Sequence, residues 1–178
     1  MTFTKTKLPG VWLITTQIFK DGRGLFFEEY NKRIFAKEGI RVDFVQDNRS
    51  LSHKGTIRGL HYQLAPMGQA KLVHVLRGRA FDVIVDLRKE SKTFGQYVSH
   101  ILDDKKKQMI YIPEGFAHGF LALEKDTEFV YKVSNFYSPK YQRGLAWNDP
   151  QIKIAWPKIN TPYLLSQKDK SHPFLNTV

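Results

Sequence analysis

The residues best suited to acid–base chemistry are a histidine in a short apolar segment and an aspartate near the end of the sequence. His61 lies in the segment GTIRGLHYQ, and if this segment is a strand, His61 and Gln63 point to the same side. An imidazole accepts and returns protons near neutral pH, and a carboxylate such as Asp169 can orient it and stabilise its charged form. The sequence alone does not bring Asp169 to His61.

Two basic residues could interact with anionic groups. Lys71 follows His61 by a short interval, and a fixed ammonium near an imidazole suits a reaction in which negative charge develops on an oxygen. Arg23 lies between two glycines in DGRGLFFE, and its planar guanidinium could bind a carboxylate or a phosphate. A single lysine is usually a solvated surface residue, and this alternative stays open for Lys71.

The segment PEGFAHG, residues 113–119, has the Pro-x-Gly-x-x-His spacing of the second half of the cupin signature, which in cupin jelly rolls brings a histidine, here His118, into the barrel mouth. The alternative is a hydrogen-bonded core histidine. Metal-binding cupins have a His-x-His pair and a glutamate where this sequence has His61-x-Gln63 and Lys71. Glutamine is a poor ligand and an ammonium repels a divalent cation, so the sequence predicts a site without metal.

The elements that must position these residues are mostly short strands. One helix is predicted at residues 31–38, where Asn31 can cap the N-terminus and Gly39 ends the helix. In FDVIVDL, residues 81–87, apolar residues alternate with Asp82 and Asp86, as in a strand. Strands about every ten residues, separated by Gly, Pro and Asp, predict a sandwich, barrel or jelly roll. The expected strands are residues 42–47, 57–63, 72–76, 81–87, 96–102, 109–112, 118–123 and 127–135.

Length and composition indicate one globular domain covering residues 1–178. Hydrophobic residues make up 42% and charged residues 25% of the 178 residues, and domains usually have about 100–200 residues. Cysteine is absent, which excludes disulfides, zinc–thiolate sites and a cysteine nucleophile. We find no signal peptide and no run near the roughly 18 apolar residues of a membrane span, so we expect a cytoplasmic protein without a membrane partner.

The formal net charge of +11 favours an anionic partner, either a nucleic acid, an anionic membrane or a phosphorylated small molecule. A nucleic-acid-binding β domain would have basic residues interleaved with aromatic residues on one strand face. The densest basic run, residues 105–107, contains no aromatic residue. We therefore expect a small phosphorylated ligand and no nucleic acid.

The ordered motifs of the sequence resemble those of the dTDP-4-dehydrorhamnose 3,5-epimerase family, metal-independent cupins of nucleotide-sugar metabolism. The resemblance runs from about residue 10 to residue 175. It implies an all-β fold, a cupin-type double-stranded β-helix (jelly roll) with few short helices, no cofactor, and a homodimer formed by exchange of N-terminal strands. The motifs are Asp21-x-Arg23-Gly24-x-Phe26-x-Glu28, Gln46-x-Asn48-x-Ser50, Gly55-x-x-Arg58-Gly59-Leu60-His61-x-Gln63, Lys71-Leu72-Val73, Asp82-Val83-x-Val85-Asp86-Leu87-Arg88, Pro113-x-Gly115-Phe116-Ala117-His118-Gly119-Phe120, Trp147-x-Asp149-Pro150 and Leu165-Ser166-x-Lys168-Asp169.

The resemblance also implies roles for individual residues. His61 looks like the general base and Asp169 like its partner. Tyr131 looks like the proton donor on the other side of the sugar ring, and Lys71 matches the residue near the C4 oxygen of the sugar. Gln142 departs from the pattern, because the family usually has a substrate-contacting glutamate at this position. The residues that match substrate contacts are Arg23, Glu28, Gln46, Asn48, Arg58, His118 and Lys168, with Phe19 and Tyr137 as the aromatics that sandwich the nucleotide base.

The reaction that the resemblance implies is epimerisation at C3 and C5 of a nucleotide-linked 4-keto-6-deoxyhexose, most simply dTDP-4-dehydro-6-deoxy-D-glucose. Removing a proton next to the C4 ketone gives an enolate, and inversion needs a second acid on the opposite face. One alternative is a mono-epimerase for another nucleotide-linked deoxysugar or heptose, since Gln142 leaves nucleotide and sugar open. A non-catalytic nucleotide-sugar-binding cupin is another, and the presence of His61, Tyr131 and Asp169 argues against it.

Overall fold

The structure, a computed structural model, describes residues 1–177, which form antiparallel strands and only short helices. No helix in this range has the length and apolar character needed to cross a membrane. The elements are β1 (Thr2–Lys5), β2 (Trp12–Thr15), β3 (Ile18–Asp21), β4 (Gly24–Phe27), α1 (Lys32–Lys37), β5 (Gln46–Ser52), β6 (Ile57–Gln63), β7 (Lys71–Arg77), β8 (Arg79–Asp86), β9 (Tyr97–Asp103), β10 (Gln108–Ile112), β11 (Phe116–Ala122), β12 (Thr127–Val133), β13 (Gln142–Gly144), α2 (Gln167–Lys170) and the 3₁₀ helix η1 (Leu175–Thr177).

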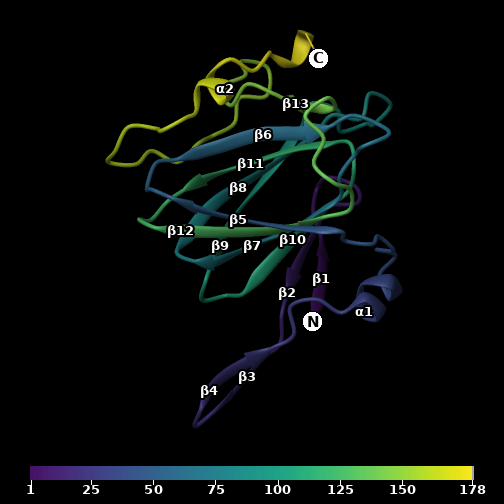
Figure 1. The fold of residues 1–178 in the computed structure, drawn as a ribbon, viewed down its shortest axis with the longest axis vertical. Helices are drawn as coiled ribbons and strands as arrows, with labels where there is room; N and C mark the ends of the chain where they lie inside the picture. Colours follow the sequence, from purple (N-terminus) through teal and green to yellow (C-terminus); the bar gives the residue numbers. More distant parts are fainter. Residues whose placement is uncertain (178) are drawn as a thin grey trace.

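Two antiparallel sheets face each other and form the jelly roll that the sequence predicts (Figure 1). The larger sheet has the order β1-β2-β10-β7-β12-β5, and the smaller sheet has the order β13-β6-β11-β8-β9. Apolar side chains of both inner faces fill the space between them, and the rings of Phe120 and Phe129 stack across it with centroids 4.1 Å apart. Burial of this apolar surface is the main force that holds the two sheets together.

The outer face of the smaller sheet is covered by the C-terminal segment of the chain. Leu60, Val83 and Val85 point outward from this sheet and pack against Leu145 and Leu175. Main-chain hydrogen bonds in both directions between Leu60 and Leu145 fix the register of this packing. The segment that carries α2 is therefore held against β6, the strand that contains His61.

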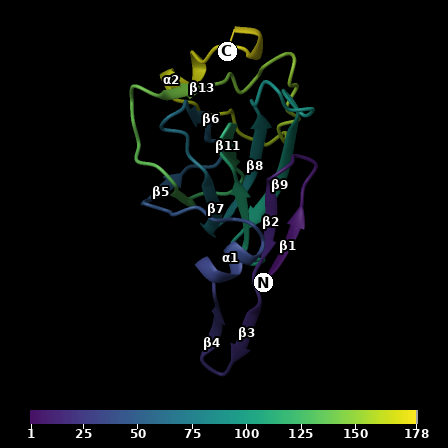
Figure 2. The same ribbon diagram turned by 90° about the vertical axis from the view of Figure 1, so that its right-hand side faces the viewer.

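A hairpin of β3 and β4 projects from the body of the molecule. It forms a separate two-stranded sheet, and Figures 1 and 2 show it extending away from the jelly roll. Phe19, Leu25 and Phe26 on this hairpin are 52–70% exposed. So much exposed apolar surface on two short strands is typical of a segment that packs against another molecule.

Most of the predicted elements are confirmed. Helix α1 lies within residues 31–38, and the Asn31 side chain accepts hydrogen bonds from the backbone N–H groups of Arg33 and Ile34. β6 has the predicted bounds, and Val83 and Val85 share a face opposite Ile84. The prediction of a strand over residues 42–47 is largely wrong, because β5 begins at Gln46 and continues through polar residues to Ser52.

Sequence reasoning missed several short elements. β1 to β4, β13 and α2 have only three or four residues each, too few to display a period. Their pairing partners fix them instead, as β10 does for β2 and β6 does for β13. Local signals were present for the β3–β4 hairpin and for α2, namely Asp21-Gly22 at the turn between β3 and β4 and the capping Ser166 at α2.

The stacked rings between the sheets lead to a stability prediction. Replacing Phe129, which is fully buried, with alanine should lower the free energy of unfolding by about 3–5 kcal/mol, because it leaves a cavity between the sheets. Urea denaturation at a fixed protein concentration measures the change. Phe94→Ala is the matched control, since Phe94 is 40% exposed, and it should change the value by no more than about 0.5 kcal/mol. Equal effects of the two variants would contradict the packing described.

Candidate active site

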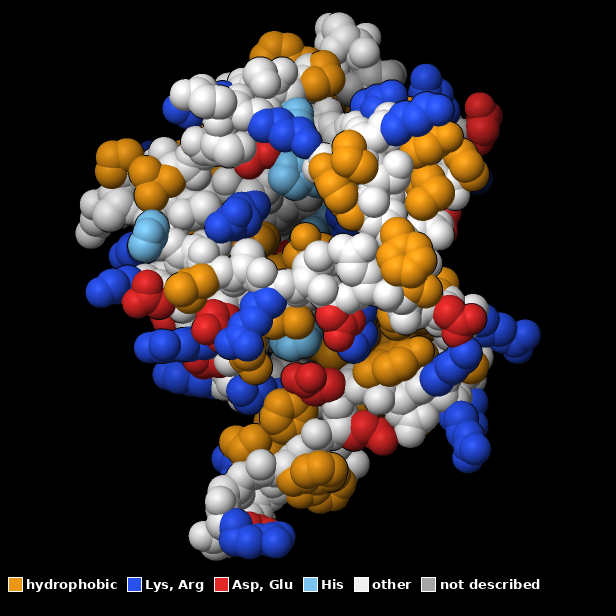
Figure 3. All heavy atoms as spheres, in the orientation of Figure 1, with side chains coloured by type: hydrophobic (Ala, Val, Ile, Leu, Met, Phe, Trp, Pro, Cys, Tyr) orange, Lys and Arg blue, Asp and Glu red, His pale blue; other side chains and the backbone are white. Residues whose placement is uncertain are grey.

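A cavity of about 410 Å³ opens between the two sheets. Figure 3 shows histidine side chains in a hollow of the upper half of the molecule, with lysine and arginine side chains beside it. All residues with a predicted catalytic role line this cavity, namely His61, Lys71, Tyr131 and Asp169. The predicted substrate-binding residues that line it are Asn48, Arg58, His118, Tyr137, Gln142 and Lys168.

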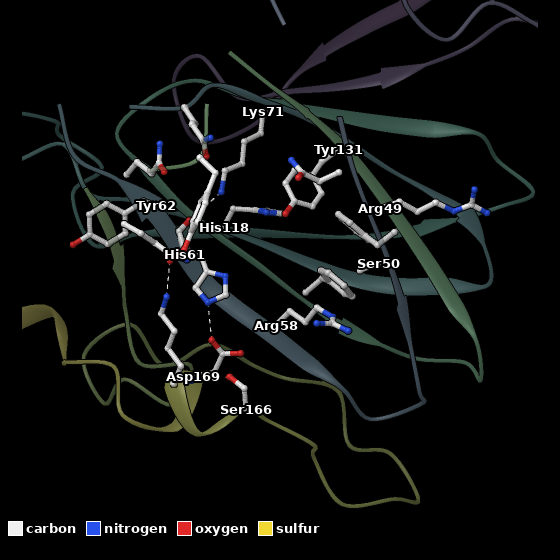
Figure 4. A pocket seen from close by; sticks show the side chains of 18 residues that line it. Arg49, Ser50, Arg58, His61, Tyr62, Lys71, His118, Tyr131, Ser166 and Asp169 are labelled. Atoms are coloured by element: carbon white, nitrogen blue, oxygen red, sulfur yellow. Dashed lines mark hydrogen bonds and ion pairs between the residues drawn. The ribbon is translucent and has the colours of Figure 1, made fainter. Parts of the chain in front are cut away.

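His61 and Asp169 are joined by a hydrogen bond, although 108 residues separate them in the sequence (Figure 4). The Nε2 atom of His61 lies 2.6 Å from Oδ1 of Asp169. Asp169 is held in place at the start of α2, where its backbone N–H donates to Oγ of the capping Ser166. The carboxylate is buried, whereas the His61 side chain keeps 31% of its surface exposed. The imidazole is therefore fixed from behind and accessible from the cavity.

Electrostatics keep the Asp169 carboxyl of this pair ionised. Burial alone would raise the pKa of the Asp169 carboxyl, but the hydrogen bond and charge of His61 outweigh it and hold the pKa below its usual range. Asp169 therefore stays ionised near neutral pH and accepts the Nε2–H of His61. The lone pair of the neutral ring is then on Nδ1, which can accept a proton.

Lys71 is a buried ammonium at the junction of the two sheets. It begins β7 in the larger sheet, and its Nζ donates to the main-chain oxygen of His61 in the smaller sheet at 3.1 Å. Burial lowers the pKa of Lys71 to about 8, although the negative charge of Asp82 opposes the shift. The interpretation of Lys71 as a solvated surface lysine is wrong, because only 6% of its surface is exposed.

Tyr131 reaches the cavity from the sheet opposite His61. It lies on β12 of the larger sheet, whereas His61 lies on β6 of the smaller one, and Figure 4 shows both rings at the cavity. Burial raises the pKa of the Tyr131 phenol, with the charge of Arg58 partly opposing this, so the phenol keeps its proton at neutral pH. Its ring also packs against the core between the sheets, which fixes the direction of the hydroxyl.

His118 combines both roles considered for it. It lines the cavity from β11, opposite His61 in the ladder, and its Nε2 lies 2.7 Å from Oδ2 of the fully buried Asp82. Sequence reasoning missed Asp82 as a site residue. The alternating pattern of β8 did contain a signal, because it places an aspartate on the same face as Ile84, which points into the core.

Gln63 is predicted to take the position of a ligand in metal-binding cupins, and in this structure its amide holds a loop. Its Nε2 donates to the main-chain oxygen of Met67 at 2.6 Å, and its Oε1 accepts from the backbone N–H of Ser138 at 2.7 Å. Both ends of the amide are thus committed to the backbone. Within residues 1–177, the side chains grouped closely enough to hold a metal ion are His61, Asp169 and His172.

The rim of the cavity is organised by two amides. Oε1 of Gln142 accepts hydrogen bonds from the Tyr137 hydroxyl at 2.7 Å and from Nζ of Lys168 at 2.5 Å. The amide oxygen of Gln142 thus accepts hydrogen bonds from two neighbours at the rim. Gln46 does not line the cavity, but it donates to Oδ1 of Asn48 and accepts from the backbone N–H of Tyr137. It therefore positions two residues that do.

Phe19, Arg23 and Glu28 do not reach the cavity of their own chain. All three belong to the projecting hairpin or its end, where Arg23 pairs with Asp21 at 2.7 Å and Glu28 accepts from Nδ2 of Asn31. The direction of β3 and β4, which lead away from the jelly roll, keeps these residues from that cavity. Their predicted contact with the substrate therefore stays a prediction.

The chain matches one family model over residues 5–177, that of dTDP-4-dehydrorhamnose 3,5-epimerase. The chain belongs to this family. It is 49% identical over 170 residues to the dTDP-4-dehydrorhamnose 3,5-epimerase of Shigella flexneri, covering 95% of this chain and 93% of that protein. The family membership and the predicted jelly-roll fold are thereby confirmed.

Solved structures of the epimerase family superpose closely on the chain. One is the dTDP-6-deoxy-D-glucose-3,5-epimerase of Legionella pneumophila in complex with dTDP-4-keto-L-rhamnose, with a TM-score of 0.95, 41% identity, and coverage of 99% of this chain and 94% of that one. Another is the dTDP-4-dehydrorhamnose 3,5-epimerase of Bacillus anthracis with TDP and PPi bound, with a TM-score of 0.93, 42% identity, and coverage of 97% and 98%.

The buried position of Lys71 predicts an unusual titration. In protein labelled with ¹³C at the lysine Cε atoms, one resonance should titrate near pH 8, because burial disfavours the charged form of Lys71. NMR spectra recorded across a pH series measure this. The resonance should be absent from Lys71→Gln and present in the control Lys105→Gln, which changes an exposed lysine. Titration of every lysine above about pH 10 would contradict the burial of Lys71.

Proposed function

We propose that this epimerase inverts C3 and C5 of dTDP-4-dehydro-6-deoxy-D-glucose and produces dTDP-4-dehydro-L-rhamnose. The observation that carries the proposal is the placement of His61 and Tyr131 on opposing sheets of one cavity. A base on one side and an acid on the other is the arrangement that inversion of a carbon centre requires. The names of the relatives and the sugar nucleotide bound in one of them support the same substrate.

In the first step, Nδ1 of His61 removes the proton from C3 or C5. The electrons of the C–H bond form a C=C bond to C4, and the C4 carbonyl becomes an enolate oxygen. Asp169 stabilises the imidazolium through the 2.6 Å hydrogen bond. The buried ammonium of Lys71 stabilises the enolate, and losing such an oxyanion donor typically costs about 10²–10³-fold in rate. With a pKa of about 8, Lys71 supplies this charge at neutral pH.

In the second step, Tyr131 gives its phenolic proton to the opposite face of the same carbon. The C4 carbonyl forms again, and the configuration of the carbon is inverted. The positive charge of Arg58 favours the transient phenolate, in the direction that it acts on the pKa of Tyr131. Solvent returns a proton to Tyr131 and takes one from His61, so the enzyme is restored for the second centre.

We also propose that the active enzyme is a homodimer in which the β3–β4 hairpin of each chain completes the cavity of the other. The hairpin carries exposed apolar side chains together with Phe19, Arg23 and Glu28, which fail to reach their own cavity. Across a two-fold interface, each chain would donate these residues to its partner. Arg23, whose side chain is 91% exposed, would then be available to the diphosphate.

Substitution of the base and of its partner should have different effects. His61→Ala should abolish both epimerisation and exchange of the C3 and C5 protons with D₂O. Asp169→Asn should only slow both, because the carboxylate orients and charges the base without taking the proton. NMR of dTDP-4-dehydro-6-deoxy-D-glucose in D₂O follows each ring position, with His53→Ala, an exposed histidine outside the cavity lining, as the control.

Two outcomes of this experiment would contradict the proposal. Near-normal exchange by His61→Ala would show that the base is another group. Exchange at only one of C3 and C5 in the unsubstituted enzyme would identify a mono-epimerase instead.

The homodimer can be tested by mixing two impaired variants. Arg23→Ala and His61→Ala should each have low activity alone, because one lacks a phosphate contact and the other lacks the base. After joint unfolding and refolding, mixed dimers contain one cavity with both residues intact, so about a quarter of the parent activity should return. Activity no higher than that of Arg23→Ala alone would show that Arg23 does not serve the partner's cavity.

A further inference from the structure

His172 is a buried imidazole next to the base, and the proposed reaction gives it no role. Only 8% of its side chain is exposed, and its Nε2 lies 3.3 Å from Oδ1 of Asp169 without meeting hydrogen-bond geometry to any of residues 1–177. A buried polar group without a well-formed hydrogen bond destabilises the folded state. Such a group in a native fold calls for an explanation, and an ion that completes the site is one of the common ones.

The fold makes specific room for this ring. A Cβ atom on Gly144 would lie 2.2 Å from the ring of His172, so only glycine at that position of β13 lets the imidazole sit there. Gly144 is also the residue paired with His61 in the ladder between β13 and β6. The rings of His61 and His172 consequently meet edge to face, with centroids 5.4 Å apart.

Both imidazoles converge on the same carboxylate oxygen. Oδ1 of Asp169 lies 2.6 Å from Nε2 of His61 and 3.3 Å from Nε2 of His172. Ligands bound to zinc at about 2.0–2.2 Å lie roughly 3.3–3.6 Å apart in tetrahedral geometry. The two separations from Oδ1 of Asp169 are therefore within about 1 Å of those in a zinc site, and small side-chain movements would bring together the three ligand atoms, which lie within 4.8 Å of one another.

We propose that His61, Asp169 and His172 form a binding site for a divalent transition-metal ion such as Zn²⁺, and that the bound ion inhibits the enzyme. Two imidazoles and one carboxylate are a common ligand set for zinc, whereas Mg²⁺ and Ca²⁺ require more oxygen ligands. The ion can enter from the cavity, because His61 and Asp169 line it.

Inhibition follows from the tautomer of His61, and this part rests on the proposed function. In the free enzyme, Nε2 of His61 carries the proton and Nδ1 carries the lone pair. When Nε2 binds the metal, the neutral ring must carry its proton on Nδ1. His61 then has no lone pair with which to remove a proton from the sugar.

The positive charge of Lys168 does not block the site. Lys168 lies close enough for its positive charge to act on His172. Its ammonium, however, is exposed and donates to Oε1 of Gln142 at 2.5 Å. The ionised Asp169 therefore supplies the only negative charge among the three ligands, directly between the two imidazoles.

Zinc binding can be measured without substrate, and so independently of the proposed function. Protein freed of metal with EDTA, a treatment that should not reduce its epimerase rate, is titrated with Zn²⁺ in competition with a chromophoric chelator. The parent should bind one ion per chain, and His172→Gln and Asp169→Asn should each weaken binding at least about tenfold. His53→Gln is the control and should bind like the parent, and excess Mg²⁺ should not compete. Binding by the parent no tighter than by His172→Gln would overturn the site.

The inhibition is tested by adding the same concentrations of Zn²⁺ to the epimerase assay. The parent should lose activity over the concentration range in which it binds the ion, and EDTA should restore it. His172→Gln, compared with its own rate without zinc, should need at least about tenfold more Zn²⁺ for the same loss. Tight zinc binding with an unchanged rate would overturn the inhibition, and the His61→Ala experiment would then show whether His61 is the base.

Discussion

The site depends on one interaction, the hydrogen bond between His61 and Asp169. The two residues are 108 positions apart, so neither can be placed without folding of almost the whole chain. What brings them together is apolar burial, since Leu60 on β6 packs against Leu145 and Leu175 of the C-terminal segment. The same packing that covers the outer face of the smaller sheet thus positions Asp169 against the proposed base.

The jelly roll converts this pair into a site with two distinct walls. The smaller sheet contributes His61 and His118, and the larger sheet contributes Lys71 and Tyr131. Burial acts on these groups in opposite directions, lowering the pKa of Lys71 to about 8 and raising that of Tyr131. Both remain protonated at neutral pH, as an ammonium for an enolate and a phenol for a carbanion require.

Local patterns in the sequence predicted the helix cap and the strands, which interactions between neighbouring residues determine. The cap at Asn31, the alternation in β8 and the bounds of β6 followed from spacing alone. The pairing of Asp169 with His61 did not, because residue types carry no information on contacts across more than a hundred positions. The resemblance to the family supplied that pairing. The direction of the β3–β4 hairpin could not be predicted from the sequence either, because it is set by the strands at its base and by whatever packs against it.

The central claim is that a base and an acid act on opposite faces of one carbon, and Tyr131→Phe tests it most directly. The substitution keeps the ring that packs in the core and removes only the hydroxyl group that would supply the proton. With dTDP-4-dehydro-6-deoxy-D-glucose in D₂O, the variant should introduce deuterium at C3 or C5 with the original configuration retained, because His61 can return a deuteron only to its own face. Inverted product formed at the rate of the parent enzyme would contradict the account.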